Sequence, residues 1–150
     1  TKTSEWKFHL PASKGFGVSS IAEVFRKHGD IEYAASLESL GDESLEGFLQ
    51  GIIDKIAFHS GIHGLIDWKT NKLPAYDEAS LRKASRSSHY WLQTHLYLVA
   101  LRRYLGNFVT VRGAWLVYLR AVRNGTPDGV LFIQPTEALL NDLDQLFKRP

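Results

Sequence analysis

The amino-acid sequence predicts a mixed α/β domain in which helices flank a central sheet. Three observations support this prediction. Short runs rich in β-branched and aromatic residues recur along the chain, one pair of runs is joined by a tight-turn sequence, and a long segment repeats its apolar residues with helical spacing. With 150 residues, the chain is long enough for one domain with a sizeable core, and neither an internal repeat nor a linker divides it. The expected order of elements is β-α-β-β-α-α-β-(β)-α.

The first third of the chain predicts a strand followed by a short helix. The strand covers residues 5–10. The helix covers residues 21–27, with Ser19 or Ser20 as its N-cap, because a serine side chain can accept a hydrogen bond from the free backbone N–H groups of the first turn. The segment 36–46 is polar and rich in turn formers, so no regular element is expected there.

Two strands joined by a tight turn form the most regular part of the chain. Residues 48–58 and 63–69 have strand character, and Ser60-Gly61 between them suits a two-residue turn, so they predict a β-hairpin. The second half of the chain predicts, in order, a basic helix at 79–86, a long helix at 88–105 ended by Gly106-Asn107, strands at 111–119 and 130–133 around a turn at 124–129, and a helix from Pro135 to Phe147.

Composition and charge exclude several classes of protein. The chain has no cysteine, which excludes disulfides and thiolate metal sites. No apolar run approaches the roughly 18 residues of a membrane span and no signal-peptide pattern opens the chain, so we expect neither a membrane segment nor an export signal. The net charge of +2 is too small to identify a nucleic-acid binder by itself. Because the chain starts at Thr1 and contains no methionine, we expect it to be a fragment of a longer protein.

The predicted hairpin brings two carboxylates together. With Ser60-Gly61 as the loop, Asp54 falls directly opposite Asp67. Residues opposed in this way have Cβ atoms about 4.5–5.5 Å apart, which allows two carboxylates to bind one divalent cation. A shift of one residue in the register would instead put the acids on opposite faces of the hairpin.

The same alternation places a lysine beside the acids on one face, which is otherwise largely apolar. The residues expected on this face are Ile52, Asp54, Ile56, Phe58, His63, Leu65, Asp67 and Lys69. Opposed acids repel and are costly to bury unpaired, so a bound cation and a nearby ammonium would resolve the conflict. Mg²⁺ takes oxygen ligands, for which Asp54, Asp67 and the backbone carbonyl of Trp68 are candidates. Lys69 would position a water or stabilise charge on a phosphate. By itself, Asp-x-Lys is common and usually marks a solvated strand edge.

Three ordered motifs then carry a family resemblance. They are Gly51-Ile52-Ile53-Asp54, Ile66-Asp67-Trp68-Lys69-Thr70-Asn71 and Gln93-Thr94-His95-Leu96-Tyr97. They resemble the G-x-x-D, (D/E)-x-K and Gln-x-x-x-Tyr elements of the RecB-like branch of the PD-(D/E)xK nucleases. Segments 5–11, 100–105 and 117–120 extend the resemblance over nearly the whole chain. It implies a restriction-endonuclease-like fold, with a mixed central sheet flanked by helices, and a single nuclease domain over residues 1–150.

The resemblance implies roles for the matching residues. In the family the two acids bind the metal and the lysine is catalytic, which assigns these roles to Asp54, Asp67 and Lys69. Gln93 and Tyr97, four residues apart on one helix face, would support the active site or contact the DNA backbone. Without the family, a helix that packs its aromatic side into the core is the more ordinary interpretation of Gln93 and Tyr97.

Further candidates lie around these motifs. Tyr90, in the segment of Gln93, is a second DNA-contacting or site-supporting tyrosine. Basic residues after the hairpin would hold DNA phosphates with salt-sensitive affinity, although a solvated helix face explains them equally well. These basic residues are Lys72, Arg82, Lys83 and Arg86. The tryptophans, Trp68 among them, are most simply core residues, and Trp68 is expected to pack against a helix.

One feature of the family has no counterpart. RecB-like nucleases usually carry a further metal-ligating histidine on a helix upstream of the first strand. None of the chain's six histidines has that place. We expect that residue to lie outside the chain, which would weaken metal binding in a fragment. His63, at the turn end of the acidic face, is expected to be a surface or packing residue.

The function that the resemblance implies is Mg²⁺-dependent DNA cleavage by the exodeoxyribonuclease part of a helicase–nuclease, in double-strand break repair and recombination. Mn²⁺ is an alternative cation. ATP would bind only at a separate helicase domain, because no Gly-x-x-x-x-Gly-Lys-Ser/Thr motif occurs here. DNA and RecC-like and RecD-like subunits are the implied partners. Two alternatives stay open: a catalytically inactive structural or DNA-guiding module, and a stand-alone RecB-like exonuclease.

Overall fold

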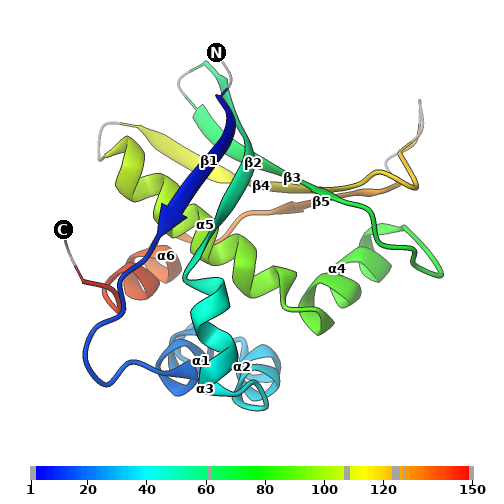
Figure 1. Cartoon of the computed structure of the whole chain (residues 1–150). Helices are drawn as coiled ribbons and strands as arrows, with labels where there is room; N and C mark the ends of the chain where they lie inside the picture. Colours follow the sequence, from blue (N-terminus) through cyan, green and yellow to red (C-terminus); the bar gives the residue numbers. More distant parts are fainter. Residues whose placement is uncertain (1–2, 61, 107–108, 123–125, 127, 149–150) are drawn as a thin grey trace.

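The computed structural model describes residues 3–60, 62–106, 109–122, 126 and 128–148. It confirms the predicted class, a mixed α/β fold with a central sheet and flanking helices (Figure 1). The elements in chain order are β1 (Thr3–His9), α1 (Val18–Lys27), α2 (Ile31–Glu38), α3 (Asp42–Leu45), the 3₁₀ helix η1 (Glu46–Phe48), β2 (Gln50–His59), β3 (Ile62–Lys69), α4 (Glu78–Ser87), α5 (Tyr90–Leu105), β4 (Thr110–Tyr118), β5 (Val130–Ile133) and α6 (Glu137–Asp144).

The five strands lie in the order β1-β2-β3-β4-β5. Strands β1 and β2, β2 and β3, and β4 and β5 pair antiparallel. Strands β3 and β4 pair in parallel, because α4 and α5 carry the chain back along the sheet before β4 begins. Helix α5 packs against β4 and α6, and α1 packs against α2 and α6. The end of β3, which carries the predicted acid and lysine, therefore lies close to the start of the α5 crossover (Figure 1).

Helix α1 begins earlier than expected. Its N-cap is Gly17, so the predicted cap at Ser19 or Ser20 is wrong, and both serines lie in the first turn. The carboxylate of Asp42 accepts a hydrogen bond from the backbone N–H of Val18 at 2.8 Å and takes the place of a local cap. A cap supplied by a residue so distant in sequence leaves no signal in the local spacing.

Two short helices, α2 and α3, occupy most of the segment where no regular element was expected. Asp30 caps α2 by accepting a hydrogen bond from the backbone N–H of Tyr33 at 3.2 Å. The helix buries Tyr33, Ala34 and Leu37 against the rest of the molecule. A helix of eight residues is too short to be stable alone. Its stability comes from this burial, which a local pattern does not reveal.

The long helix α5 starts two residues later than predicted. The backbone of His89 is left-handed, with φ of 61°, and this breaks the continuity with α4. Tyr90 thereby becomes the first residue of α5. Gly106, with φ of 81°, ends the helix as predicted.

The last helix is shorter than expected. It begins after Thr136, whose side chain accepts a hydrogen bond from the backbone N–H of Leu139, and it ends at Asp144. Phe147, the predicted last residue, instead forms an isolated bridge with Ala12. The remaining predicted elements are confirmed with small shifts of their ends. Parts of the predicted turns, at residues 61, 107, 124–125 and 127, lie outside the described residues.

Helix α5 passes through the middle of the core and buries residues on most of its circumference. His95 is one of them, with its ring edge-on to Phe25 and its Nδ1 2.6 Å from the carbonyl oxygen of Trp91. Burial lowers the pKa of His95 to about 4, against the raising effect of the Trp91 carbonyl. Within the described residues, no helix is both long enough and apolar enough to cross a membrane.

The buried His95 predicts a pH-dependent stability. An unfolded histidine takes up a proton near pH 6.5, whereas folded His95 does so only near pH 4. Protonation therefore favours the unfolded chain in this window, and stability should fall by up to about 3 kcal/mol as the pH drops from 6.5 to 4. Denaturant unfolding across this range checks the prediction. The difference between wild type and His95→Gln should fall with pH, and a constant difference would contradict it.

Candidate active site

The hairpin of β2 and β3 has the predicted register. Lys55 pairs with Ile66 and Phe58 pairs with His63. Beyond the first of these pairs the two strands part, because β2 continues beside β1 while β3 continues beside β4. Asp54 and Asp67 are the first residues past this fork, one on each strand. The two acids that were predicted to oppose each other therefore lie where the sheet opens. The divergence of β2 and β3 can be followed in Figure 1.

The fork interrupts the alternation of side chains along β2. Ile56 is buried as expected, but the next buried isoleucine is Ile53, three residues away, and Ile52 is 41% exposed. Phe58, at the other end of the expected apolar face, is 47% exposed. The prediction of one continuous apolar face is therefore wrong at both ends. The physical reason is that β2 loses its pairing with β3 at this point and keeps only β1 as a neighbour, so the period of two does not hold through the fork.

Asp67 and Lys69 form a buried ion pair on β3. The two side chains lie on the same side of the strand, 5% and 8% exposed as residues, and Lys69 Nζ is 2.6 Å from Asp67 Oδ2. Burial raises the pKa of Asp67 to about 6, with a smaller raising contribution from the Asp54 carboxylate, while the positive charge of Lys69 opposes the rise. A buried acid with a raised pKa beside a specific charged partner is typical of functional sites.

Lys69 is also held by helix α5. Its Nζ donates a hydrogen bond to Gln93 Oε1 at 2.9 Å, and it lies 3.7 Å from the centroid of the Tyr90 ring. Tyr90 and Gln93 are three residues apart at the start of α5, so they share one face of the helix. The structure thus brings the Asp-x-Lys motif and the Gln-x-x-x-Tyr motif together through the lysine.

Asp54 is oriented by the backbone of the opposite strand. Its Oδ2 accepts a hydrogen bond from the backbone N–H of Trp68 at 3.1 Å. The N–H and C=O of one strand residue point to the same edge of the strand. The carbonyl of Trp68 therefore faces the Asp54 side, whereas the carbonyl of Lys69 accepts from Leu119 on the β4 side. The Trp68 side chain is 42% exposed, so its expected packing against a helix is wrong.

Tyr97 on α5 lies close to Gly51 and explains why the first motif has a glycine at this position. A Cβ at Gly51 would lie 3.1 Å from both Cε1 and Oη of Tyr97, so the strand approaches the ring closely only because residue 51 is glycine. The ring also packs edge-on against Phe8. Burial, aided by the carboxylates of Asp67 and Asp54, raises the pKa of Tyr97 to about 12.

Two of the basic residues after the hairpin, Arg86 and Arg82, have acidic partners. Arg86 forms two hydrogen bonds to Asp30, at 2.8 and 2.7 Å, and its guanidinium lies 5.0 Å from the Trp91 ring centroid. Arg82 bonds Glu78 at 3.4 Å and lies 5.4 Å from the same ring. Lys72 is exposed in the segment after β3. A role in phosphate binding stays a prediction for all three residues.

Sequence reasoning missed two residues around Lys69. Asn71 Oδ1 accepts a hydrogen bond from the Tyr90 hydroxyl at 3.1 Å. Tyr118 pairs with Lys69 across β3 and β4 and is 1% exposed, and its hydroxyl has no hydrogen-bond partner among the described residues. Burial raises the pKa of Tyr118 to about 12, with Tyr90 and Asp67 adding to the rise. Both residues lie in stretches that carry the family resemblance, but no role was predicted for either. The Asn71 contact depends on where α5 begins, and the place of Tyr118 depends on the parallel pairing of β3 with β4.

The donor atoms at the fork are those that Mg²⁺ prefers. Two carboxylates and a carbonyl oxygen are hard oxygen ligands, and Mg²⁺ commonly takes one or two carboxylates and fills its other positions with water or phosphate oxygens. Within the described part of the chain, no group of three or more histidine, cysteine, aspartate or glutamate side chains is placed to hold a metal ion. His63 packs against Phe58 and His28 bonds Asp142, so neither supplies a third ligand.

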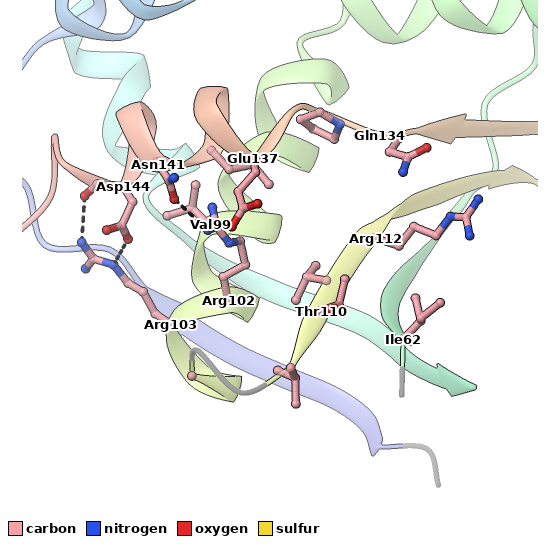
Figure 2. A pocket seen from close by; sticks show the side chains of 15 residues that line it. Ile62, Val99, Arg102, Arg103, Thr110, Arg112, Gln134, Glu137, Asn141 and Asp144 are labelled. Atoms are coloured by element: carbon pink, nitrogen blue, oxygen red, sulfur yellow. Dashed lines mark hydrogen bonds and ion pairs between the residues drawn. The ribbon is translucent and has the colours of Figure 1, made fainter. Parts of the chain in front are cut away.

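A separate hollow lies at the other end of α5, between that helix, the start of β4 and α6 (Figure 2). Three arginines line it: Arg102, Arg103 and Arg112. Arg102 bonds Asn141 and Arg103 bonds Asp144, both on α6. The residues that line this hollow include none of the predicted site residues, so it is distinct from the site at the fork.

The site has an acid on each of the two diverging strands, a lysine two residues after the second acid, and a helix that holds this lysine. This combination defines a class of protein. The model of the PD-(D/E)XK nuclease superfamily matches residues 12–149, and the chain belongs to this superfamily.

The similar curated proteins are RecB subunits of RecBCD enzymes, which confirms the resemblance to the RecB-like branch. The subunit of Haemophilus influenzae is 29% identical over 154 residues, covering 95% of this chain and 12% of that protein. The subunit of Escherichia coli K12 is 28% identical, covering 97% of the chain and 13% of that protein. For Mycobacterium tuberculosis the identity is 31%, over 97% of the chain and 16% of that protein. The chain thus spans a small part of the length of these relatives.

Proposed function

We propose that this domain hydrolyses DNA phosphodiester bonds with Mg²⁺, or alternatively Mn²⁺, as its cofactor. The observation that supports this most is the arrangement at the fork: Asp54 and Asp67 stand on facing strands, and Lys69 joins Asp67 to Gln93. Asp54, Asp67 and the carbonyl of Trp68 would hold the cation. When bound, the cation polarises the phosphoryl group and lowers the pKa of an attacking water.

The protein's own residues orient the reacting groups. The backbone N–H of Trp68 fixes the Asp54 carboxylate, and Gln93 fixes the ammonium of Lys69. That ammonium stabilises the charge that develops on the phosphate in the transition state, which is effective because the group is aimed in advance and largely removed from water. Burial of Asp67 limits the competition of solvent for its oxygens.

We propose the larger assembly to which this domain belongs from the names of its relatives. The names of the relatives describe subunits of a RecBCD enzyme. We infer an exodeoxyribonuclease role in double-strand break repair and recombination, in the cytoplasm, with RecC-like and RecD-like partner subunits and with ATP bound only at a separate helicase domain. Lys72, Arg82 and Arg86 would contact the DNA backbone, and Tyr97 would support the site.

Two alternatives lead to different results. A catalytically inactive module that guides DNA would bind DNA without cleaving it, and would have no need of the acid–acid–lysine set at the fork. A stand-alone exonuclease would cleave without other subunits. The first alternative is disfavoured by the buried Asp67–Lys69 pair, because two buried charges that serve no chemistry are costly to keep.

The test is cleavage of linear DNA by the purified domain under a titration of Mg²⁺, with chelator and calorimetric cation binding measured in parallel. We expect cation binding and release of nucleotides or fragments that depend on Mg²⁺ and need no ATP. Cation binding without cleavage would support the DNA-guiding module. Neither binding nor cleavage at millimolar Mg²⁺ or Mn²⁺ would contradict the proposed nuclease activity.

A further inference from the structure

The aromatic ring beside Lys69 belongs to Tyr90, the first residue of α5. Lys69 Nζ lies 3.7 Å from the centroid of this ring, which is direct contact of an ammonium with the negative face of an aromatic side chain. The ring is tied at its far end, since the Tyr90 hydroxyl donates to Asn71 Oδ1 at 3.1 Å. Asn71 follows Lys69 by two residues, so ring and lysine are anchored to the same end of β3.

Lys69 needs the contact with the Tyr90 ring when a cation is bound at the site. In the structure its ammonium is 2.6 Å from Asp67, the same carboxylate that would bind the divalent cation. A divalent cation bound to Asp67 would replace the Lys69 ammonium as the partner of the carboxylate, and its charge would repel that ammonium. Lys69 would then keep two contacts, Gln93 Oε1 and the Tyr90 ring.

We propose that Tyr90 is a positioning residue whose ring face holds the Lys69 ammonium in place once a divalent cation occupies Asp67. This inference rests on the proposed nuclease function for its effect on cleavage, but the contact itself can be measured without cleavage. Two features support it beyond the contact distance. The left-handed backbone at His89 starts α5 at Tyr90, and the spacing of three residues puts Tyr90 and Gln93 on the same helix face.

The contact can be detected by NMR of the Lys69 side chain. Protons over the face of an aromatic ring are shifted upfield, so the Lys69 methylene protons next to Nζ should show such a shift with and without Mg²⁺. The shift should vanish in Tyr90→Leu and persist in Tyr90→Phe. Absence of the shift in wild type, or its loss when Mg²⁺ binds, would overturn the proposal whatever the cleavage assay gives.

The effect on cleavage separates positioning from simple packing. In Tyr90→Leu we expect kcat to fall about 10-fold, with KM for DNA and the affinity for Mg²⁺ unchanged. Tyr90→Phe, which keeps the ring and loses only the bond to Asn71, should stay within about 3-fold of wild type. Tyr104→Leu is the matched control, because it removes an exposed tyrosine ring from the other end of α5 and should leave kcat unchanged.

A graded series tests the electrostatic origin of the effect. Phenylalanine analogues with increasing fluorination at residue 90 keep the ring shape but weaken the negative face of the ring. We expect log kcat to fall steadily along the series, while the melting temperature stays level. A flat series would show that the ring only packs, and would overturn the proposal. If wild type cleaves no DNA, the proposed function fails, and the NMR experiment still decides whether Tyr90 holds Lys69.

Discussion

Replacing Asp67 by asparagine is expected to abolish cation binding and to reduce DNA cleavage on the order of 1,000-fold. The substitution removes the charged ligand on one arm of the fork while keeping its shape. Calorimetric titration with Mg²⁺ and cleavage of linear DNA measure the two effects on the same sample. Asp142→Asn is the matched control, because Asp142 is an acid on α6 that pairs with Lys27 and His28 and should leave both quantities unchanged.

The stability of wild type relative to the same variant should depend on pH. The pKa of Asp67 is raised to about 6 in the folded protein, from an ordinary value of 3.8. Stability is therefore lost as the pH rises from 3.8 through 6, and at neutral pH the charged Asp67 costs up to about 3 kcal/mol. Asparagine does not titrate, so the free energy of unfolding of wild type should fall relative to that of Asp67→Asn as the pH rises from 3.8 through 6. A difference between the two proteins that stays constant over this range would contradict the prediction.

Replacing Lys69 by methionine is expected to move binding and catalysis in opposite directions. Cleavage should fall about 100-fold or more, because the charge on the phosphate loses its positioned ammonium. Mg²⁺ affinity should rise about 3- to 10-fold, because the ammonium no longer competes for Asp67. Kinetic constants and calorimetry measure both effects.

A matched variant controls for the loss of a lysine from the hairpin. Lys55, on β2 at the last pair before the fork, faces Ile66, and Lys55→Met should change neither the affinity nor the rate. If Lys69→Met bound Mg²⁺ more weakly than wild type, the Asp67–Lys69 contact would be part of the cation site instead of a competitor for it.

Much of the site could be predicted from the hairpin alone. The turn at Ser60-Gly61 sets the register, and the register places Asp54 and Asp67 opposite each other. The prediction that the same register continues as one largely apolar face was wrong. Ile53 is buried instead of Ile52, because β2 loses β3 as a neighbour at the fork and keeps only β1. Register is a local property of a turn, whereas the choice of a strand's neighbours is a property of the whole sheet.

The remaining contacts of Lys69 could not be predicted from local sequence patterns. Gln93 and Tyr97 were found because they match a family motif, since periodicity alone favours ordinary core packing for them. Asn71 and Tyr118 lie in stretches that resemble the family, but their contacts depend on the tertiary structure: Asn71 bonds Tyr90 at the start of α5, and Tyr118 pairs with Lys69 across the parallel strands β3 and β4. The helix α2 was missed for a related reason: its stability comes from the burial of Tyr33 and its neighbours, not from its own periodicity.

If the domain is a metal-dependent nuclease, one divalent cation binds between the two arms of the fork. Anomalous diffraction from crystals of this domain soaked in Mn²⁺ would locate that cation. We expect a peak in contact with the carboxylates of Asp54 and Asp67 and with the carbonyl of Trp68, absent in Asp67→Asn crystals. A well-occupied Mn²⁺ peak elsewhere with none at the fork, or a fork peak that persists in Asp67→Asn, would contradict it.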